Sequence, residues 1–359
     1  MAGQRPITMR EIAERCGVSP SVVSAVVNGH EDRIFVSDAT RERVLTVVRE
    51  TGYQPRQTRR PQEPPPESVR VAIVSPVSHL AIFSVTIAQL SEALSENDCI
   101  PIAHVVPEPV EERWAQTERL YEGKQAQAFV FLGSTHVPIS RLAAHVPLVV
   151  IGEVLPEDED RAWRVCLDNH HAGQTIAHYL WALGHRRAGI AGYLEPTYTR
   201  DRIGAFIRSW VDRGGVWSDD LEFDLPSGPD ATVQTALQTG LRDFLDGAER
   251  RLGGPLTALF CMTDFQAALT MRAVQRLGLR VPEDLSIVSI DDWPLLAEGL
   301  NPRLTTLRQP FAALGRVAAQ LLQERLHGSR QPRRVLLPGE LIVRESCASA
   351  RVLHGAPSL

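Results

Sequence analysis

The chain has 359 residues, of which 43% are hydrophobic and 23% charged, a balance typical of a soluble globular protein with a sizeable core. At this length we expect more than one domain. No apolar run approaches the ~18 residues that a membrane span needs, and the first residues lack a signal-type apolar stretch. We therefore expect a cytoplasmic protein without membrane contact.

Charge is unevenly distributed along the chain. Residues 1–60 carry a net charge of +3 and the remainder −8, for −5 overall. A basic N-terminal segment on an acidic remainder suits a segment that meets a polyphosphate such as DNA. The five cysteines are far apart and form no CxxC or Cys/His cluster, so we expect buried thiols and neither a metal site nor a cofactor.

Residues 7–53 are predicted to form three short helices. Thr8 and Glu11 form a capping box at the start of the first helix. Ser19 followed by Pro20 is an N-cap with proline at the first helical position, which predicts the start of a second helix. Two short capped helices in succession are typical of a helix-turn-helix, whose second helix lies in the DNA major groove. The alternative is a plain three-helix bundle that contacts protein.

The segments ITMREIAERCGVSPSVVSAVVNG and VSDATRERVLTVVRETGYQPR closely resemble the DNA-binding head of the LacI/GalR family of bacterial regulators. The resemblance implies that Pro20, Ser21 and Ala25 face the bases. Family members usually have arginine at the third of these positions, so a bidentate guanine contact is missing here. The methyl group of Ala25 could instead touch a thymine methyl.

The resemblance also implies contacts to phosphate or sugar groups, which position the head without reading sequence. They fall on Ser19, Ser24, Asn28 and Tyr53. For Ser19 an alternative role as a helix cap alone explains a serine equally well.

Residues 54–68 contain five prolines and no apolar periodicity, which indicates an extended linker. In the family a short hinge helix normally stands here and inserts a leucine pair into the minor groove. This chain has neither the alanine run nor the leucines. Arg56, Arg59 and Arg60 could instead enter a narrow minor groove or meet phosphates. The alternative is a solvated tether.

Beyond the linker, short apolar runs alternate with amphipathic helical stretches, a pattern typical of parallel sheets covered on both faces. The length of this part exceeds one such sheet, so we expect two α/β lobes. The expected strands are 69–75, 128–132, 147–151, 188–193, 256–261 and 285–290. The expected helices lie near 83–97, 111–124, 171–183, 202–213, 231–250, 265–277 and 311–327.

Stretches such as LDNHHAGQTIAHYLWALGHRRAGIAG and NPRLTTLRQPFAALGRVAAQLL resemble the periplasmic-binding-protein-like body of the same family. The resemblance implies a homodimer, an effector cleft between two lobes, and a chain that crosses between the lobes three times. We therefore expect a helix-turn-helix head (1–53), a linker (54–68), a body (69–348) and a flexible tail (349–359). Lobe 1 would comprise about 69–169 and 309–337, and lobe 2 about 170–308 and 338–348.

Two aspartates follow expected strands, where ligands of parallel sheets bind: Asp291 directly follows 285–290, and Asp264 lies just after 256–261. The resemblance makes Arg202 and Asp291 the strongest effector contacts, a guanidinium and a carboxylate suited to hydroxyl or acidic groups. Asp264 is more easily explained as the cap of the helix 265–277 than as an effector contact. Thr263 stands where the family often has an asparagine of the pocket.

The first-lobe loop departs from the family. Where relatives often read DxSNPFF, this chain has Val77 to Phe83, and only Phe83 is retained. The pocket should therefore be more apolar, which puts an ordinary sugar effector in doubt. His79 is either a new polar effector contact or a solvated loop side chain.

The leading hypothesis is a dimeric repressor that binds a pseudo-palindromic operator and responds to a small molecule between its lobes. A second hypothesis is a DNA-binding regulator that no longer responds to a small effector. A third is a solute-binding module with an incidental helical head, which the intact head argues against. No GxSxG, HExxH, Walker A or GxGxxG motif stands in the required context, so we do not expect an enzyme.

Overall fold

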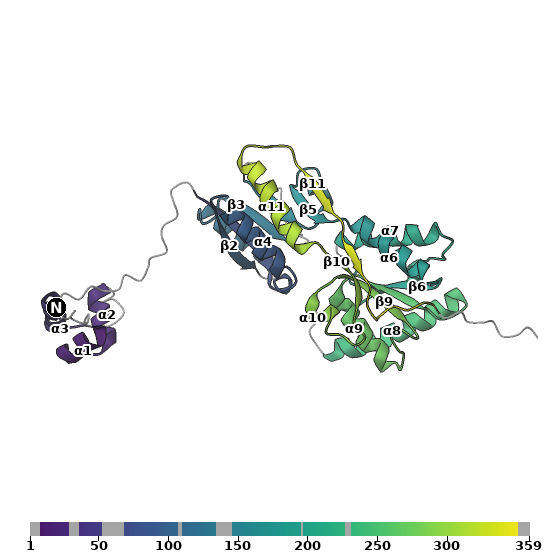
Figure 1. Ribbon diagram of the computed structural model, residues 1–359, viewed down its shortest axis with the longest axis horizontal. Helices are drawn as coiled ribbons and strands as arrows, with labels where there is room; N and C mark the ends of the chain where they lie inside the picture. The colour runs from purple at the N-terminus through teal and green to yellow at the C-terminus, as the bar shows by residue number, and fades with distance from the viewer. Residues whose placement is uncertain are drawn as a thin grey trace, which may run out of the picture. The chain divides into compact units, whose positions relative to one another are not determined.

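The computed structural model describes residues 8–28, 36–51, 68–106, 110–133, 146–194, 197–226 and 231–350. The chain forms two compact units, Met1–Pro66 and Glu67–Leu359 (Figure 1).

The first unit is helical, with α1 (Met9–Cys16), α2 (Pro20–Asn28) and α3 (Asp38–Thr51). Thr8 caps α1 in a capping box with Glu11, and Gly17 ends it in the left-handed conformation at φ 62°. The three helices share one small core, formed by Ile12, Ala13, Cys16, Val23, Val26 and Val44. Valine is a mediocre helix former, so this packing is what stabilises α2.

The second unit contains two six-stranded sheets. The first sheet comprises β1 (Val69–Pro76), β2 (Cys99–Val106), β3 (Ala128–Leu132), β4 (Leu148–Ile151), β5 (Arg164–Leu167) and β11 (Arg334–Leu337). Its strand order is β11-β5-β4-β3-β1-β2, and all its pairs are parallel. The second sheet comprises β6 (Ala188–Gly192), β7 (Glu222–Asp224), β8 (Ala258–Cys261), β9 (Ser286–Asp291), β10 (Thr305–Arg308) and β12 (Glu340–Ile342). Its order is β12-β10-β9-β8-β6-β7, with β12 antiparallel to β10.

Helices cover both faces of each sheet. On the first sheet, α4 (Ser84–Ser95) and α11 (Phe311–Leu326) share one core, and α5 (Val110–Glu122) packs on the other face through Trp114. On the second sheet, α8 (Ala231–Leu252) and α9 (Asp264–Arg276) cover one face, and α6 (Asn169–Ala182) with α7 (Thr197–Val211) the other (Figure 1). We call the first sheet with its helices lobe 1 and the second lobe 2.

The chain passes between the lobes three times: from β5 into α6, from β10 into α11, and from β11 into β12. Figure 1 shows the second passage, in which α11 returns to lie beside α4. The segments that follow the carboxyl ends of β1, β8 and β9 lie near these passages. Side chains from distant parts of the sequence can therefore meet there.

The expected strands and helices of the body are all present, with ends that shift by a few residues. Six strands were not anticipated: β2, β5, β7, β10, β11 and β12. Several of them lack a continuous apolar run. In the described part of the chain, no helix has the length and apolar character to cross a bilayer.

Candidate functional site

The N-terminal end of α2 presents small polar groups to solvent. Ser19, Pro20 and Ser21 are exposed. The Ser19 hydroxyl accepts from the Val22 N–H over 3.4 Å and shares a 2.8 Å hydrogen bond with the hydroxyl of Ser21. Ser19 therefore caps α2, and Pro20 and Ser21 lie free of the head's core at the end that a recognition helix turns toward bases.

Ala25, which the resemblance places at a base-facing position, has a side chain that is only 5% exposed. Little of its methyl group is open to a thymine methyl, and its role as a base contact stays a prediction. Ser24 is half-buried, and Asn28 is the last residue of α2. Tyr53, Arg56, Arg59 and Arg60 lie outside the described residues.

In the body, Arg202 and Asp291 both lie at the carboxyl edge of the second sheet: Arg202 Nη1 donates to the carbonyl of Met262, which follows β8, and Asp291 Oδ2 accepts from the Asp264 N–H over 3.4 Å. Arg202 lies on α7 and Asp291 ends β9, and both are buried. Burial and then the nearby charge of Asp264 raise the pKa of the Asp291 carboxyl to about 8, and the guanidinium charge of Arg202 opposes the rise. This pair stands at the carboxyl edge of the second sheet, where parallel sheets bind their ligands.

The backbone at the end of β9 is strained. Asp291 has φ 139° and Asp292 φ 57°, two consecutive non-glycine residues with positive φ. Such conformations cost of order 1–3 kcal/mol each and gather at binding sites. Asp292 is not available to a ligand, because its carboxylate pairs with Arg308 at 2.6 Å and Arg344 at 2.7 Å.

Asp264 does not cap α9, which corrects the expectation from sequence. The cap is Thr263, whose hydroxyl accepts from the Gln266 N–H over 3.3 Å. The two adjacent residues are both common N-caps, and only the structure shows which one holds that place. The Thr263 side chain is half-buried.

The carboxylate of Asp264 is fully buried and already has three donors. The hydroxyls of Ser289 and Thr306 each donate to Oδ1 over 2.6 Å, and the Trp293 N–H donates to Oδ2 over 2.7 Å. Burial raises the pKa of Asp264, and these three hydrogen bonds oppose the rise. Asp264 thus links β9 to β10 through hydrogen bonds, and this geometry does not support an effector contact.

Two functional candidates escaped the sequence reasoning. Asp168 caps α6 by accepting from the His171 N–H over 2.9 Å, but the next residue, Asn169, accepts from Arg202 Nε over 2.6 Å. The same Asn169 side chain donates to Glu153 Oε1 over 3.1 Å. The adjacent Asp168 and Asn169 were the available sequence signal for Asn169. Nothing in the sequence singled out Glu153.

His79 and Phe83 lie near the carboxyl edge of the first sheet. His79 ends a short 3-10 helix (Val77–His79), and its imidazole lies against Gly133, in the space a side chain would fill. The Phe83 ring packs 5.8 Å from the His79 ring and 5.7 Å from the Phe311 ring, centroid to centroid. Both residues are half-buried, so His79 is not a solvated loop side chain.

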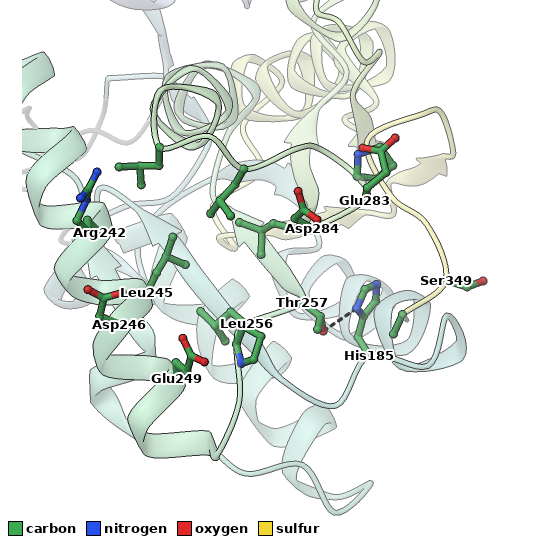
Figure 2. Close-up of a pocket in the computed structure, with 16 residues that line it drawn as sticks. His185, Arg242, Leu245, Asp246, Glu249, Leu256, Thr257, Glu283, Asp284 and Ser349 are labelled. Atoms are coloured by element: carbon green, nitrogen blue, oxygen red, sulfur yellow. Dashed lines mark hydrogen bonds between the residues drawn. The ribbon is translucent and has the colours of Figure 1, made fainter. Parts of the chain in front are cut away.

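A separate cavity of about 570 Å³ opens at the opposite, amino-terminal edge of the second sheet. Figure 2 shows Leu245 and Leu256 facing it, with Asp246 and Glu249 of α8 at its rim. His185 is held there by hydrogen bonds with the Thr257 hydroxyl at 2.9 Å and the Ala348 carbonyl at 3.0 Å. None of the expected effector residues lines this cavity, and its position contradicts the usual placement of ligands at carboxyl ends.

Known proteins match this chain over nearly its whole length. Residues 8–56 match the bacterial regulatory proteins of the lacI family, and residues 177–347 match the periplasmic binding protein-like domain. The HTH-type transcriptional regulator MalR of Streptomyces coelicolor is 30% identical over 361 residues, covering 97% of this chain and 99% of the relative. The ribose operon repressor of Haemophilus influenzae is 28% identical over 353 residues, covering 96% of this chain and 99% of the repressor.

Two solved structures have the same fold over nearly the full length. The transcriptional regulator CelR in complex with cellobiose has a TM-score of 0.68 at 26% identity, covering 95% of this chain and 99% of CelR. The lac repressor dimer bound to operator and the anti-inducer ONPF has a TM-score of 0.63 at 22% identity, covering 96% of this chain and 100% of the repressor. At that identity, the second comparison speaks for the fold alone.

These matches confirm the resemblance and the fold expected from sequence: a helix-turn-helix head and a two-lobed α/β body with parallel sheets. They also place the chain among transcription regulators, not enzymes. The chain is a DNA-binding transcription regulator and belongs to the lacI family of bacterial regulatory proteins.

Proposed function

We propose that this regulator is a repressor that binds a pseudo-palindromic operator as a homodimer and responds to a small molecule held by Arg202 and Asp291. The observation that carries the proposal is that this guanidinium and this carboxyl are both buried at the carboxyl edge of the second sheet, Arg202 bonded to the Met262 carbonyl after β8 and Asp291 at the end of β9. Burial of two such groups costs desolvation energy, and their hydrogen bonds to Asn169, Met262 and Gln309 offset part of that cost. A ligand that bonds to both groups would offset more of it.

The proposed effector is a polyhydroxylated compound of the sugar class. Sugar hydroxyls can accept from a guanidinium and donate to a carboxylate in the same site. The relative CelR is found in complex with cellobiose, and another relative is a ribose operon repressor. On the side of lobe 1, His79 and Phe83 would offer an aromatic surface to the apolar face of a sugar ring, with Thr263 of lobe 2 as a further polar neighbour.

The proposed reader is the head, about residues 1–53, joined by the linker 54–68 to the sensing body 69–348. Pro20 and Ser21 would meet base edges, because they are exposed at the start of α2. The proposed phosphate or sugar contacts are Ser19, Ser24, Asn28 and Tyr53, with Arg56, Arg59 and Arg60 in the linker.

The effector site is tested by thermal unfolding with a sugar panel that includes cellobiose and ribose. A sugar present at 100 times its Kd adds about 2.7 kcal/mol of stability and raises the unfolding temperature. Arg202→Ala should abolish that rise. Arg200→Ala is the matched control, because Arg200 is an exposed arginine on the same helix.

The outcomes separate the hypotheses. A sugar that stabilises the natural chain and the Arg200 variant but not the Arg202 variant supports the proposed site. Stabilisation that survives Arg202→Ala places the effector elsewhere. If no compound in a broad metabolite panel raises the unfolding temperature while the chain still binds operator, the regulator without small-molecule control replaces this proposal.

A further inference from the structure

A buried carboxylate in lobe 1 lies next to the proposed effector site. Glu153 follows β4 by two residues and is 6% exposed. Its two oxygens serve different partners: Oε2 accepts from Arg164 Nη1 over 2.9 Å, and Oε1 accepts from Asn169 Nδ2 over 3.1 Å. Arg164 begins β5 in the same lobe, whereas Asn169 begins α6 in lobe 2. Glu153 therefore connects the two lobes.

The polarity of this connection is fixed by chemistry. A carboxylate can only accept hydrogen bonds and a guanidinium can only donate them. Asn169 lies between one of each, so its amide nitrogen must face Glu153 and its amide oxygen must face Arg202. The Arg202 Nε–H donates to that oxygen over 2.6 Å, and Arg202 Nη1 donates to the Met262 carbonyl over 2.8 Å. The orientation of the asparagine, and with it the position of Arg202 Nε, depends on Glu153.

A second connection runs parallel to the first. Arg334, which begins β11, has Nη2 3.9 Å from Glu153 Oε1 and 3.7 Å from Asp201 Oδ2. Asp201 is the neighbour of Arg202 on α7. Glu153 is thus linked to the same point of α7 twice, once through Asn169 and once through Arg334.

We propose that Glu153, acting through Asn169, positions Arg202 for the effector and thereby couples the effector site to lobe 1. The inference rests on the proposed function only where it names Arg202 as an effector contact. If Glu153 served Arg164 alone, one oxygen would suffice and the amide of Asn169 would be free to turn. Both oxygens are used, and the second one sets the direction of the chain of hydrogen bonds that ends at Arg202.

The substitution Glu153→Gln tests this direction. Glutamine has one side-chain oxygen where glutamate has two. The buried guanidinium of Arg164 should keep its hydrogen bond to that oxygen, because leaving a buried charge unpaired costs more than losing the hydrogen bond to Asn169. The new amide NH₂ then faces the NH₂ of Asn169. Asn169 must turn to present its oxygen, which puts its NH₂ against Arg202 Nε–H, a donor against a donor. The Arg202 Nε–H loses its acceptor, while Nη1 keeps the Met262 carbonyl.

Adding Asn169→Asp to Glu153→Gln should restore the connection with the polarity reversed. The amide NH₂ at position 153 donates to one carboxylate oxygen at position 169, and the other oxygen accepts from Arg202 Nε–H. The number of charges stays that of the natural chain. A role of Glu153 in general stability would not predict rescue by moving its charge to position 169.

The readout that needs no ligand is hydrogen exchange of the Arg202 Nε–H, followed by NMR of the full chain labelled with ¹⁵N-arginine and assigned by Arg202→Lys. Exchange should become at least about tenfold faster in Glu153→Gln, the loss of one buried hydrogen bond. It should return to within about threefold of the natural rate in the double variant. Glu159→Gln is the matched control, because Glu159 is the exposed second partner of Arg164, 3.5 Å from its Nη2.

An unchanged exchange rate in Glu153→Gln, or a double variant that exchanges as fast as Glu153→Gln, overturns the proposal. If Glu153→Gln does not fold, Asn169→Ala decides instead. It removes the bridge while leaving the pair of Glu153 with Arg164 intact, and it should accelerate exchange equally. A natural rate in that variant also overturns the proposal.

The effect of Glu153 on effector binding is tested in a separate experiment. Calorimetry with cellobiose and ribose should show about tenfold weaker binding of the active sugar in Glu153→Gln and recovery in the double variant. If neither sugar binds the natural chain, the sugar class proposed above fails, and the exchange experiment still decides whether Glu153 positions Arg202. If exchange follows the expected pattern while sugar affinity does not move, the link to the effector is refuted.

Discussion

Gln309 holds Asp291 at two points: its side-chain Nε2 donates to Asp291 Oδ1 over 2.6 Å, and its backbone N–H donates to the Asp291 carbonyl over 3.2 Å. Gln309 lies in the second passage between the lobes, after β10 and before α11. Asn169 contacts Arg202 from the start of the first passage, and Arg334 lies on the strand that leads into the third. The first two passages therefore each have a polar side chain bonded to one of the two proposed effector contacts, and the third has Arg334 close to Asp201, the neighbour of Arg202. Movement of one lobe relative to the other would change these contacts.

Replacing Gln309 with leucine should destabilise the body by about 1–3 kcal/mol, because the buried Asp291 Oδ1 loses its donor. Loss of that hydrogen bond should also raise the pKa of Asp291 further, since Gln309 is one of the groups that lower it. Thermal unfolding measures the first effect. Gln320→Leu, an exposed glutamine on α11, is the control and should lie within about 0.5 kcal/mol of the natural chain. Equal effects in both variants would contradict the role of Gln309.

The pH dependence of stability should carry a contribution from Asp291. Its pKa is raised in the folded chain, chiefly by burial and then by Asp264, above the value of about 3.9 expected in the unfolded chain. The folded state therefore binds the proton more tightly. The stabilisation this provides is complete below the unfolded pKa and is lost as the pH rises through the folded pKa.

Asp291→Asn removes this titration, so its unfolding free energy should fall less between pH 4 and pH 8 than that of the natural chain. Denaturant unfolding at several pH values measures the two slopes. Asp212→Asn, at an exposed position after α7, should keep the natural slope. If Asp291→Asn has the natural slope too, burial does not raise the pKa of this carboxyl.

Gly133→Ala should disturb the lobe 1 side of the effector site. Gly133 has φ 84°, and a Cβ there would collide with the His79 imidazole. Gly214 is the matched control, because it has φ 90° with no heavy atom within 4 Å of the added Cβ. Gly214→Ala should cost about 1 kcal/mol from backbone strain alone. Gly133→Ala should cost more, and should also weaken effector binding if His79 contributes to the site. Equal losses of stability in the two variants would show that His79 moves away without cost.

The sequence was informative where burial follows a continuous apolar run. The continuous apolar runs at 128–132 and 285–290 predict buried parallel strands, and apolar periodicity predicts the helices of the body. β10 was missed because it begins with Thr305 and Thr306, which are polar yet fully buried. Their hydroxyls are bonded to the Arg344 N–H and to Asp264, partners remote in sequence. A polar residue in a buried strand is predictable only when its partner is known.

The site was predictable in part for the same reason. Arg202 and Asp291 came from the family resemblance together with the rule that ligands bind at carboxyl ends of strands. Glu153 was out of reach, because its importance lies in contacts with Arg164, Asn169 and Arg334 that only the folded chain brings together. Ala25 is the reverse case. Its position in the resemblance suggested a base contact, and only the folded head shows that most of so short a side chain is buried.

The head should carry all specific affinity for DNA. Removing residues 1–60 takes away the whole basic segment and the proposed recognition helix α2. The remaining chain, which forms a compact unit of its own, should stay folded and should fail to retard operator in a gel at physiological salt. Retardation that survives the deletion would place the DNA reader in the body.

The linker should bind DNA through charge and not by inserting apolar side chains. Residues 54–68 lie almost wholly outside the described part of the chain, but their sequence has three arginines, five prolines and no leucine. Without an apolar wedge, the cost of unstacking a central base step is not offset. The bound operator should therefore be bent less sharply than is typical of family members that insert a leucine pair. Replacing Arg56, Arg59 and Arg60 with alanine should reduce the salt dependence of operator binding by up to about 3 in slope if each meets a phosphate. Base preference at the outer half-sites should stay the same, because Pro20 and Ser21 are untouched.

Titration of operator binding against salt measures the slope, and circular-permutation gels measure the bend. The matched control is Arg10, Arg41 and Arg49 replaced together, since these are exposed arginines of α1 and α3 away from the start of α2. Their loss should change the slope less than loss of the linker arginines, because the proposed DNA contacts lie on α2 and the linker. A natural slope in the linker variant would leave residues 54–68 as a tether. A sharp central bend would show that some other side chain opens the central step, and the electrostatic account of the linker would be wrong.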